Sequence, residues 1–248
     1  MIAIRSEEEL RHLRVSGKIL AEVFAELEPL MVPGMWTDEL DRIAAELIRA
    51  RGARPAFKGY RGYPAHICVS IDEEVVHGIP THRALKSGQL VGVDIGVEKE
   101  GYFSDAAKTF LVGTVSPEKE RLARETEVAR RRGIAQAVAG NRLGDISHAV
   151  QSYVEAQGYS VVRDLVGHGI GRRLQEDPQI PNYGKPHTGP RLKRGMVLAI
   201  EPMVNMGGWR VRTREDGWTV VTEDGSPSAH FEHTVVVTGG SPEILTRI

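Results

Sequence analysis

Residues 85–94 read LKSGQLVGVD, and residues 192–201 read LKRGMVLAIE. The two stretches align without a gap, and the alignment places Asp94 on Glu201. Each stretch is a Leu-Lys-x-Gly segment that continues as an apolar strand and ends in a carboxylate. Internal repeats can determine a whole architecture, and two copies are too few for a solenoid. The repeat therefore predicts two similar halves that face each other, with their acidic residues meeting between them.

The segments around this repeat recur in the same order. Upstream, His77 begins HGIP and His168 begins HGIG. Downstream, the stretch SDAAKTFLVG, with Asp105, corresponds to FEHTVVVTG, with Glu232. The repeat therefore includes polar residues of the kind that form sites, as well as the strands that carry them.

Length and composition are those of an ordinary globular protein. The chain has 248 residues, a net charge of -1 and no Pro/Gly/Ser-rich linker. We therefore expect a single domain, residues 1–248, with pseudo-repeated halves of about 1–115 and 116–248. Nothing in the overall charge points to DNA, and no apolar run is long enough to span a membrane.

The cellular location is predicted from the cysteine content and the N-terminus. Cys68 is the single cysteine, which excludes an intrachain disulfide and fits a reducing compartment. The first residues, MIAIRSEEELR, lack the apolar core of a signal peptide. We therefore expect a cytoplasmic protein, and we take it to be a monomer.

Four stretches have the spacing of helices. The first begins at the capping-box pair Ser6 and Glu9 and ends at Pro29. The other three are expected at about 37–52, 117–139 and 145–158. Each half thus begins with two helices and continues with strands. This order predicts an α+β fold, in which helices cover the outer face of a mostly antiparallel, curved sheet.

A hairpin carries the first two acids. Residues 90–97 alternate like a strand, and residues 98–101 have the composition of a turn. A symmetric turn there pairs residues whose numbers sum to 199, which places Asp94 directly opposite Asp105. Like charges in that position are destabilising, and a divalent cation between them would remove the penalty. Two solvated carboxylates are the alternative interpretation.

Two further carboxylates lie in apolar strand sequences. Glu201 is part of VLAIEPMV, and Glu232 is part of AHFEHTVVV. A buried carboxylate needs a partner, which is either a basic side chain or a metal ion. His168, between glycines in GHGIG, is either a turn residue or a ligand. With the two hairpin acids, these residues form an oxygen and nitrogen donor set, without sulfur, sufficient for two divalent ions.

Several segments together closely resemble the bacterial type I methionine aminopeptidases: GYRGYP, EEVVHGIP, VDIG with YFSDAA, VGHGIGR, AIEPMV, EDGWTVVT and HFEHTVVVT. The resemblance extends from the first helix to the last strand and implies the pseudosymmetric pita-bread fold. It implies a single catalytic domain whose two metal ions (Co, Mn, Fe(II) or Zn) are bound by five residues: Asp94, Asp105, His168, Glu201 and Glu232. Asp105 and Glu232 would bridge the ions, Asp94 would bind one ion, and His168 and Glu201 the other.

The resemblance also implies the reaction. A hydroxide between the metals would attack the scissile carbonyl and release the initiator methionine from nascent proteins and peptides with a small second residue. Glu201 would be the general base, and His77 would hydrogen-bond the substrate backbone. The resemblance places the methionine pocket at Tyr60, Tyr63, Cys68 and Trp218, with Phe57 and Leu174 at its edge. Aromatic residues that only fill the core are the alternative, most of all for Trp218.

One position departs from the family pattern. After GHGIGR the family has a second histidine, and this chain reads GRRLQEDPQ, with Gln175 at that place. The family histidine holds and polarises the substrate carbonyl. Glutamine can donate a hydrogen bond but cannot carry a positive charge. We therefore expect reduced turnover with intact metal binding, whether Gln175 is a natural or an engineered variant.

Three arginines in WRVRTRE, Arg210, Arg212 and Arg214, alternate along an expected strand. They form either a solvated basic face or a transient contact with ribosomal RNA, since the implied substrate is a nascent chain. Two other functions stay open: a proline-specific peptidase of the same fold, such as prolidase, and a catalytically weakened binding module. Prolidases usually have an additional N-terminal domain, and binding modules usually lose metal ligands.

Overall fold

The computed structural model describes residues 2–247. The first part of the chain contains, in order, α1 (Glu7–Leu27), the 3-10 helix η1 (Glu28–Leu30), α2 (Thr37–Ala50), β1 (Arg54–Pro55), the 3-10 helix η2 (Tyr60–Gly62), β2 (Cys68–Ile71), β3 (Glu74–Val76), β4 (Gln89–Lys99) and β5 (Tyr102–Val112). The second part contains α3 (Pro117–Ala135), α4 (Leu143–Ala156), β6 (Ser160–Val161), β7 (Val166–Gly169), β8 (Glu176–Pro181), β9 (Val197–Ile200), β10 (Met203–Asn205), β11 (Val211–Thr213), β12 (Val220–Thr222), β13 (Ser228–His230), β14 (His233–Val236) and β15 (Glu243–Ile244).

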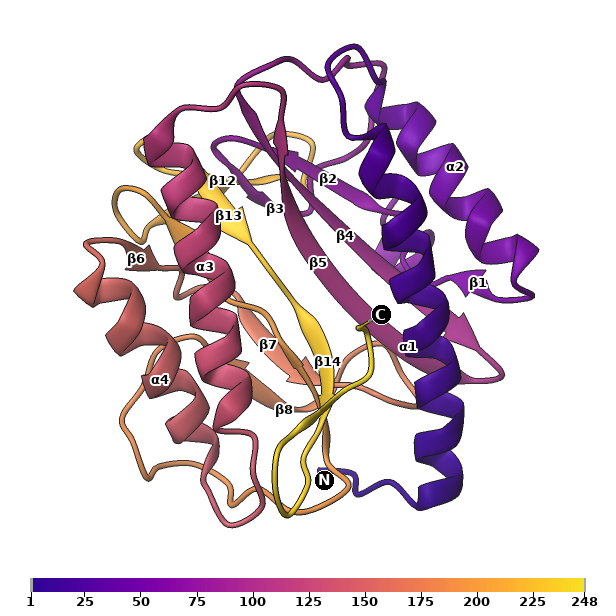
Figure 1. Ribbon diagram of the computed structural model, residues 1–248, viewed down its shortest axis with the longest axis vertical. Helices are drawn as coiled ribbons and strands as arrows, with labels where there is room; N and C mark the ends of the chain where they lie inside the picture. Colours follow the sequence, from indigo (N-terminus) through magenta and orange to yellow (C-terminus); the bar gives the residue numbers. More distant parts are fainter. Residues whose placement is uncertain (1, 248) are drawn as a thin grey trace.

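The strands pair antiparallel, and their hydrogen bonding divides them into four sheets. One contains β1-β4-β2 with β5 on β4, and another contains β15-β14-β9-β7-β8. Two three-stranded sheets, β13-β10-β6 and β11-β12-β3, complete the fold, and the second joins strands from both parts of the chain. Figure 1 shows α1 and α3 lying over the same side of the strands, with α2 and α4 beyond them. The α+β prediction is confirmed, with a curved surface of several sheets in place of one continuous sheet.

The first helix forms as its sequence predicts. The Ser6 hydroxyl accepts a hydrogen bond from Glu9 N at 3.3 Å, and the Glu9 carboxylate accepts one from Ser6 N at 3.0 Å. Leu13, Leu20 and Val23 form its apolar stripe and are fully buried. Packing against the C-terminal segment is tight at Gly17, where a Cβ atom would lie 2.4 Å from the Leu245 carbonyl oxygen.

The other helices lie close to their predicted ranges, except that α3 is shorter than expected. It ends at Ala135, whereas the sequence predicted helix to residue 139. Beyond the helix, Ala139 N donates to Thr238 O at 2.8 Å, which joins this segment to the C-terminal part. No helix within residues 2–247 has the length and apolar composition to cross a membrane.

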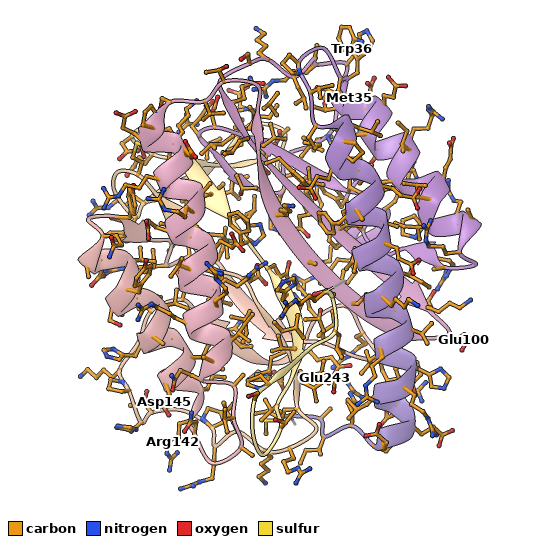
Figure 2. The ribbon with its side chains drawn as sticks, in the orientation of Figure 1. Met35, Trp36, Glu100, Arg142, Asp145 and Glu243 are labelled. Carbon is orange, nitrogen blue, oxygen red and sulfur yellow. The ribbon has the colours of Figure 1, made fainter. Side chains whose placement is uncertain are left out.

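The register of the β4–β5 hairpin differs from the prediction. Asp94 pairs with Ala107, and Asp105 pairs with Gly96, so the two acids are diagonal neighbours on one face. The turn consists of Glu100 and Gly101, whose φ angles of 54° and 80° are those of a tight two-residue turn. Figure 2 shows Glu100 at the outer end of the hairpin. The predicted direct opposition was therefore wrong by two residues, although both carboxylates share a face.

The repeat has a local structural counterpart. Gly88 and Gly195, which align in the two copies, have φ angles of 93° and 84°, a conformation that favours glycine. Each directs the chain into a strand, β4 or β9, that leads to an acid. The division of one domain into halves of 1–115 and 116–248 stays a prediction.

Threonine side chains join the two parts of the chain at the centre. Thr234 Oγ1 donates to Asp105 O at 2.7 Å and accepts from Asp105 N at 3.0 Å. Thr109 Oγ1 likewise donates to His230 O at 2.8 Å and accepts from His230 N at 2.9 Å. These contacts hold β5 beside residues 230–234, so that the acids of both parts meet.

Candidate metal centre

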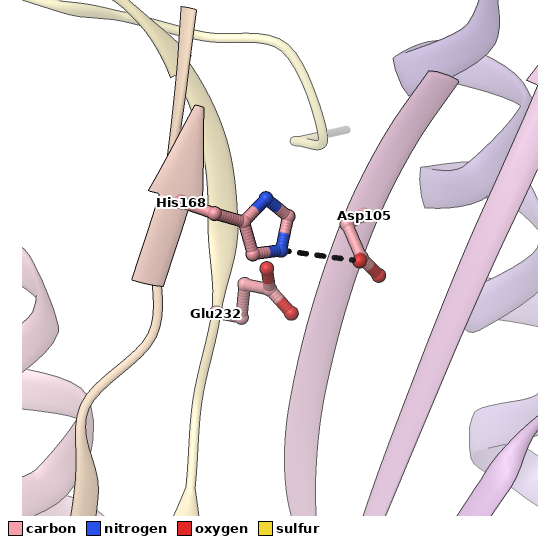
Figure 3. A group of neighbouring side chains, drawn as sticks. All are labelled: Asp105, His168 and Glu232. Atoms are coloured by element: carbon pink, nitrogen blue, oxygen red, sulfur yellow. Dashed lines mark ion pairs between the residues drawn. The ribbon is translucent and has the colours of Figure 1, made fainter. Parts of the chain in front are cut away.

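Five elements bring the predicted ligands together. Asp94 lies on β4, Asp105 on β5 and His168 on β7, while Glu201 follows β9 and Glu232 precedes β14. Figure 3 shows three of these side chains, Asp105, His168 and Glu232, pointing toward one another from different segments of the chain. One ligand atom each from Asp105, His168 and Glu232 lies within 4.8 Å of the others. The sequence repeat thus corresponds to one compact group of acids and imidazole.

His168 is oriented to use one ring nitrogen as a ligand. Its Nδ1 lies 2.9 Å from Gly169 O, and because a carbonyl only accepts, this nitrogen carries the proton. This tautomer of the neutral imidazole leaves the lone pair of Nε2 available to a metal ion. Nε2 lies 3.8 Å from Asp105 Oδ2 and 3.5 Å from Glu201 Oε1, so it points into the acidic cluster.

In the absence of metal, burial makes the acidic groups of the cluster hard to ionise. Desolvation raises the pKa of Asp94 and of Glu201 to about 7. Desolvation, followed by repulsion from neighbouring carboxylates, raises the pKa of Asp105 and Glu232 well above the usual range. A cation among these groups would offset both causes, because it favours the charged form of each.

The donor atoms fit divalent metal ions better than basic side chains. Asp94 Oδ1, Asp105 Oδ1 and Glu232 Oε1 are buried without a hydrogen-bond partner within residues 2–247. Arg130 approaches Glu232 at the backbone, where Nη1 donates to the carbonyl oxygen at 3.3 Å. Within residues 2–247 only histidines lie at ion-pair distance from the carboxylates of the cluster, and no Lys or Arg forms an ion pair with them. Hard oxygen donors with an imidazole suit divalent ions.

A cavity of about 110 Å³ opens onto this cluster. Phe57 and Arg61 line it. Every predicted site residue lines it as well: Tyr60, Tyr63, Cys68, His77, Asp94, Asp105, His168, Leu174, Gln175, Glu201, Trp218 and Glu232. Asp105, His168 and Glu232 form one group in this lining, and Phe57, Tyr63, Cys68 and Leu174 belong to one apolar cluster. The cavity therefore combines a polar cluster with an apolar pocket.

Comparison with sequence profiles of known families identifies the family of this chain. The profile of metallopeptidase family M24 matches residues 11–239. The chain belongs to metallopeptidase family M24. Members of this kind use divalent metals, and the carboxylate and histidine groups of this M24 protein provide ligands for them.

Full-length relatives agree with this assignment. The methionine aminopeptidase of Clostridium perfringens is 54% identical over 248 residues, with 100% of both chains covered. Methionine aminopeptidase 1 of Bacillus subtilis is 51% identical, also with 100% of both chains covered. The crystal structure of methionine aminopeptidase from Thermotoga maritima superposes with a TM-score of 0.98 at 46% identity and covers 100% of each chain. The pita-bread fold expected from the sequence is confirmed.

Prolidases share the fold at a greater distance. The prolidase of Pyrococcus furiosus has a TM-score of 0.80 and 21% identity, and this chain covers 65% of its length. That similarity establishes a common M24 fold and nothing about the substrate.

The apolar end of the M24 site is built around Tyr63. Its hydroxyl donates toward Gly78 O at 2.9 Å, and its ring meets Trp218 edge-on at 5.2 Å and Phe57 at 6.5 Å. Cys68 is 4% exposed, and burial raises the pKa of its thiol well above the usual value, so the thiol is a neutral wall. Trp218 thus contributes to the cavity as well as to the core.

His230 is a site residue that the sequence interpretation missed. Its buried Nε2 has no hydrogen-bond partner among the described residues and lies 3.7 Å from Glu201 Oε2. Burial lowers the pKa of His230 to about 4, so the imidazole is neutral at pH 7. The sequence contained one signal for it: His230 and Glu232 are two residues apart in AHFE, and side chains at that spacing in an extended chain point to the same side.

Proposed function

We propose that this M24 metallopeptidase is a methionine aminopeptidase that removes N-terminal methionine from peptides with a small second residue. The observation that carries the proposal is that one cavity combines a metal-ligand cluster with an apolar pocket lined by Tyr63, Cys68 and Trp218. The pocket can bury an unbranched thioether side chain, and the cluster beside it can receive the scissile bond. Full-length relatives at 51–54% identity carry this name.

The residues have distinct tasks in this proposal. Asp94, Asp105, His168, Glu201 and Glu232 would hold the ions, which when bound acidify water and polarise a carbonyl. Glu201 would also take up a proton as general base, since a neighbouring cation keeps its carboxylate charged at neutral pH. Burial lowers the pKa of His77 to about 4, so His77 stays neutral and can donate a ring N–H to the substrate backbone.

A direct test compares two peptide classes with the metal-loaded protein. We expect free methionine from a Met-Ala-Ser peptide and no cleavage of a Leu-Pro dipeptide. Cleavage of Leu-Pro alone would favour the proline-specific alternative, and metal binding without cleavage of either peptide would favour the weakened binding module.

Gln175→His should raise kcat on Met-Ala-Ser by about five-fold. Hydrogen bonds from charged donors contribute roughly 1 kcal/mol more than neutral ones, which corresponds to that factor. Metal content should not change, because Gln175 is not among the proposed ligands. Steady-state rates with metal analysis check this, and an unchanged or lower kcat would show that glutamine is not a handicap.

Ribosome contact, a cytoplasmic location and a monomeric state belong to the same proposal. Arg210 and Arg212 are exposed, whereas Arg214 is engaged in ion pairs with Glu73 and Glu74 at 2.8 and 2.6 Å. The expected row of three free arginines is therefore reduced to two. Arg210→Ala combined with Arg212→Ala should weaken salt-sensitive cosedimentation with ribosomes, and binding that survives both changes would exclude this surface.

A further inference from the structure

The turn between β7 and β8 carries two residues of the cavity wall. Leu174 is buried, and Gln175 is exposed at the opening, where Tyr60 Oη donates to Gln175 Oε1 at 3.3 Å. Both residues precede the first residue of β8 and lie outside the sheet ladders. Their placement therefore depends on contacts that the turn makes with the rest of the protein.

Glu176 organises this turn from inside. Its Oε1 accepts hydrogen bonds from Arg172 N at 2.8 Å and from Arg173 N at 3.0 Å. Charge-assisted hydrogen bonds of this kind are stronger than neutral ones. The backbone before Leu174 is thus wrapped around the Glu176 carboxylate.

The other oxygen of the same carboxylate is held by the N-terminal segment. Arg5 Nη2 donates to Glu176 Oε2, and the two side chains are 8% and 9% exposed. Arg5 is itself fixed, because its backbone N donates to Gly195 O at 2.8 Å. Its guanidinium also lies against Gly171, where a Cβ atom would be 2.3 Å from Nη2.

These contacts form a continuous connection from the segment before α1 to the cavity wall. A buried ion pair contributes little net stability compared with apolar packing, but removing one partner leaves the other buried and uncompensated. Loss of Arg5 would therefore free the Glu176 carboxylate to turn toward solvent. The two backbone N–H groups would lose their acceptor, and Leu174 and Gln175 would lose their fixed positions.

We infer that Arg5 is a positioning residue, which acts through Glu176 to hold Leu174 against the methionine side chain and Gln175 toward the substrate carbonyl. This inference rests on the proposed function and adds to it a residue that lies outside the cavity. Arg5 touches neither the cavity nor the cluster, so its effect on substrate selection is indirect.

The test uses Arg5→Ala in the metal-loaded, full-length protein, well below its melting temperature. We expect kcat/KM on Met-Ala-Ser to fall by about 10- to 100-fold, because a misplacement of about 1 Å can cost that factor. The ratio of kcat/KM for Met-Ala-Ser to kcat/KM for Leu-Ala-Ser should also decrease, since Leu174 no longer shapes the pocket. Arg5→Lys should restore most of the preference, because it keeps the positive charge beside Glu176.

Arg14→Ala is the matched control. Arg14 also joins the N-terminal part of the chain to a distant carboxylate, with Nε 2.6 Å from Glu243 Oε1, but this pair is more exposed and neither residue is among those that line the cavity of the metal centre. We expect the control to keep kcat/KM and the preference for methionine. Glu176→Ala should resemble Arg5→Ala, and the double variant should be no worse than Glu176→Ala alone.

A second readout separates this inference from the proposed function. Binding of methionine amide, measured by calorimetry, should weaken in Arg5→Ala at unchanged metal content, whether or not peptides are cleaved. If the unaltered protein binds methionine amide but releases no methionine, the proposed function fails and the comparison of binding still tests Arg5. If Arg5→Ala only lowers the melting temperature, while kcat/KM, preference and binding stay unchanged, the inference is overturned.

Discussion

Glu232→Gln is expected to remove bound metal and to lower kcat/KM for methionine release by about 1,000-fold or more. Metal ions supply several kcal/mol of transition-state stabilisation, and each 1.4 kcal/mol corresponds to about ten-fold in rate. Glu232 is 2% exposed. It belongs to two groups of side chains that could hold a metal ion, one with Asp105 and His168 and the other with Glu201 and His230. The amide keeps the shape of the side chain and removes its charge. Metal analysis and steady-state kinetics check both losses.

The stability of the same variant distinguishes a lost ligand from a damaged fold. In the metal-free state, Glu232→Gln should melt at a higher temperature than the unaltered protein, because it removes one buried acid from a cluster of acids. Glu223→Gln, at an exposed position, is the control and should change neither metal content nor rate. Full activity of Glu232→Gln with bound metal would refute the assignment of Glu232.

The metal-free protein should lose stability as the pH rises from about 6.5 to 8. Asp94 and Glu201 have a pKa of about 7 in the folded state, against model values of 3.8 and 4.5. In this window the folded state therefore binds protons that the unfolded chain has released, and stability falls with rising pH. Asp94 and Glu201 are half ionised near pH 7, so together they hold just under one proton on average over this range, which corresponds to about 1.5 kcal/mol.

Buried histidines have the opposite effect on the pH dependence of stability, and they set the lower limit of this pH window. Burial lowers the pKa of His77 and His230 to about 4 and that of His233 to about 3. These groups destabilise the folded state as the pH falls below about 6.5, and above that value they are neutral in both states.

Thermal melts at pH 6.5, 7 and 8, with chelator and with manganese, test this prediction. Manganese at 1,000 times its Kd should stabilise the folded protein by about 4 kcal/mol in total. Because metal binding requires ionised carboxylates, this stabilisation at a fixed manganese concentration should grow over the same pH range. A melting temperature of the metal-free protein that stays constant or rises from pH 6.5 to 8 would contradict the raised pKa values.

The sequence predicted the fold and the group of site residues because both depend on local patterns. The LKxG repeat, the capping box at Ser6 and the acids at strand ends need only short-range information. The roles assigned to the individual ligands and pocket residues stay predictions. The fold class and the family of metal-dependent hydrolases are confirmed.

Features that depend on packing were beyond the sequence patterns. The hairpin register followed from the φ angles of Glu100 and Gly101, which a count of residues does not give. His230 was missed because a buried histidine in an apolar strand resembles core until Glu201 is placed beside it. Arg5 and Glu176 are 171 residues apart, and their contact exists only in the folded protein.

The most direct measurement is a titration of the chelated protein with manganese, in which bound metal and methionine release from Met-Ala-Ser are followed together. The account predicts no release without metal and a rate that rises with bound manganese until the cluster is filled. Methionine release at an undiminished rate by metal-free protein, or a filled cluster without any release, would contradict it.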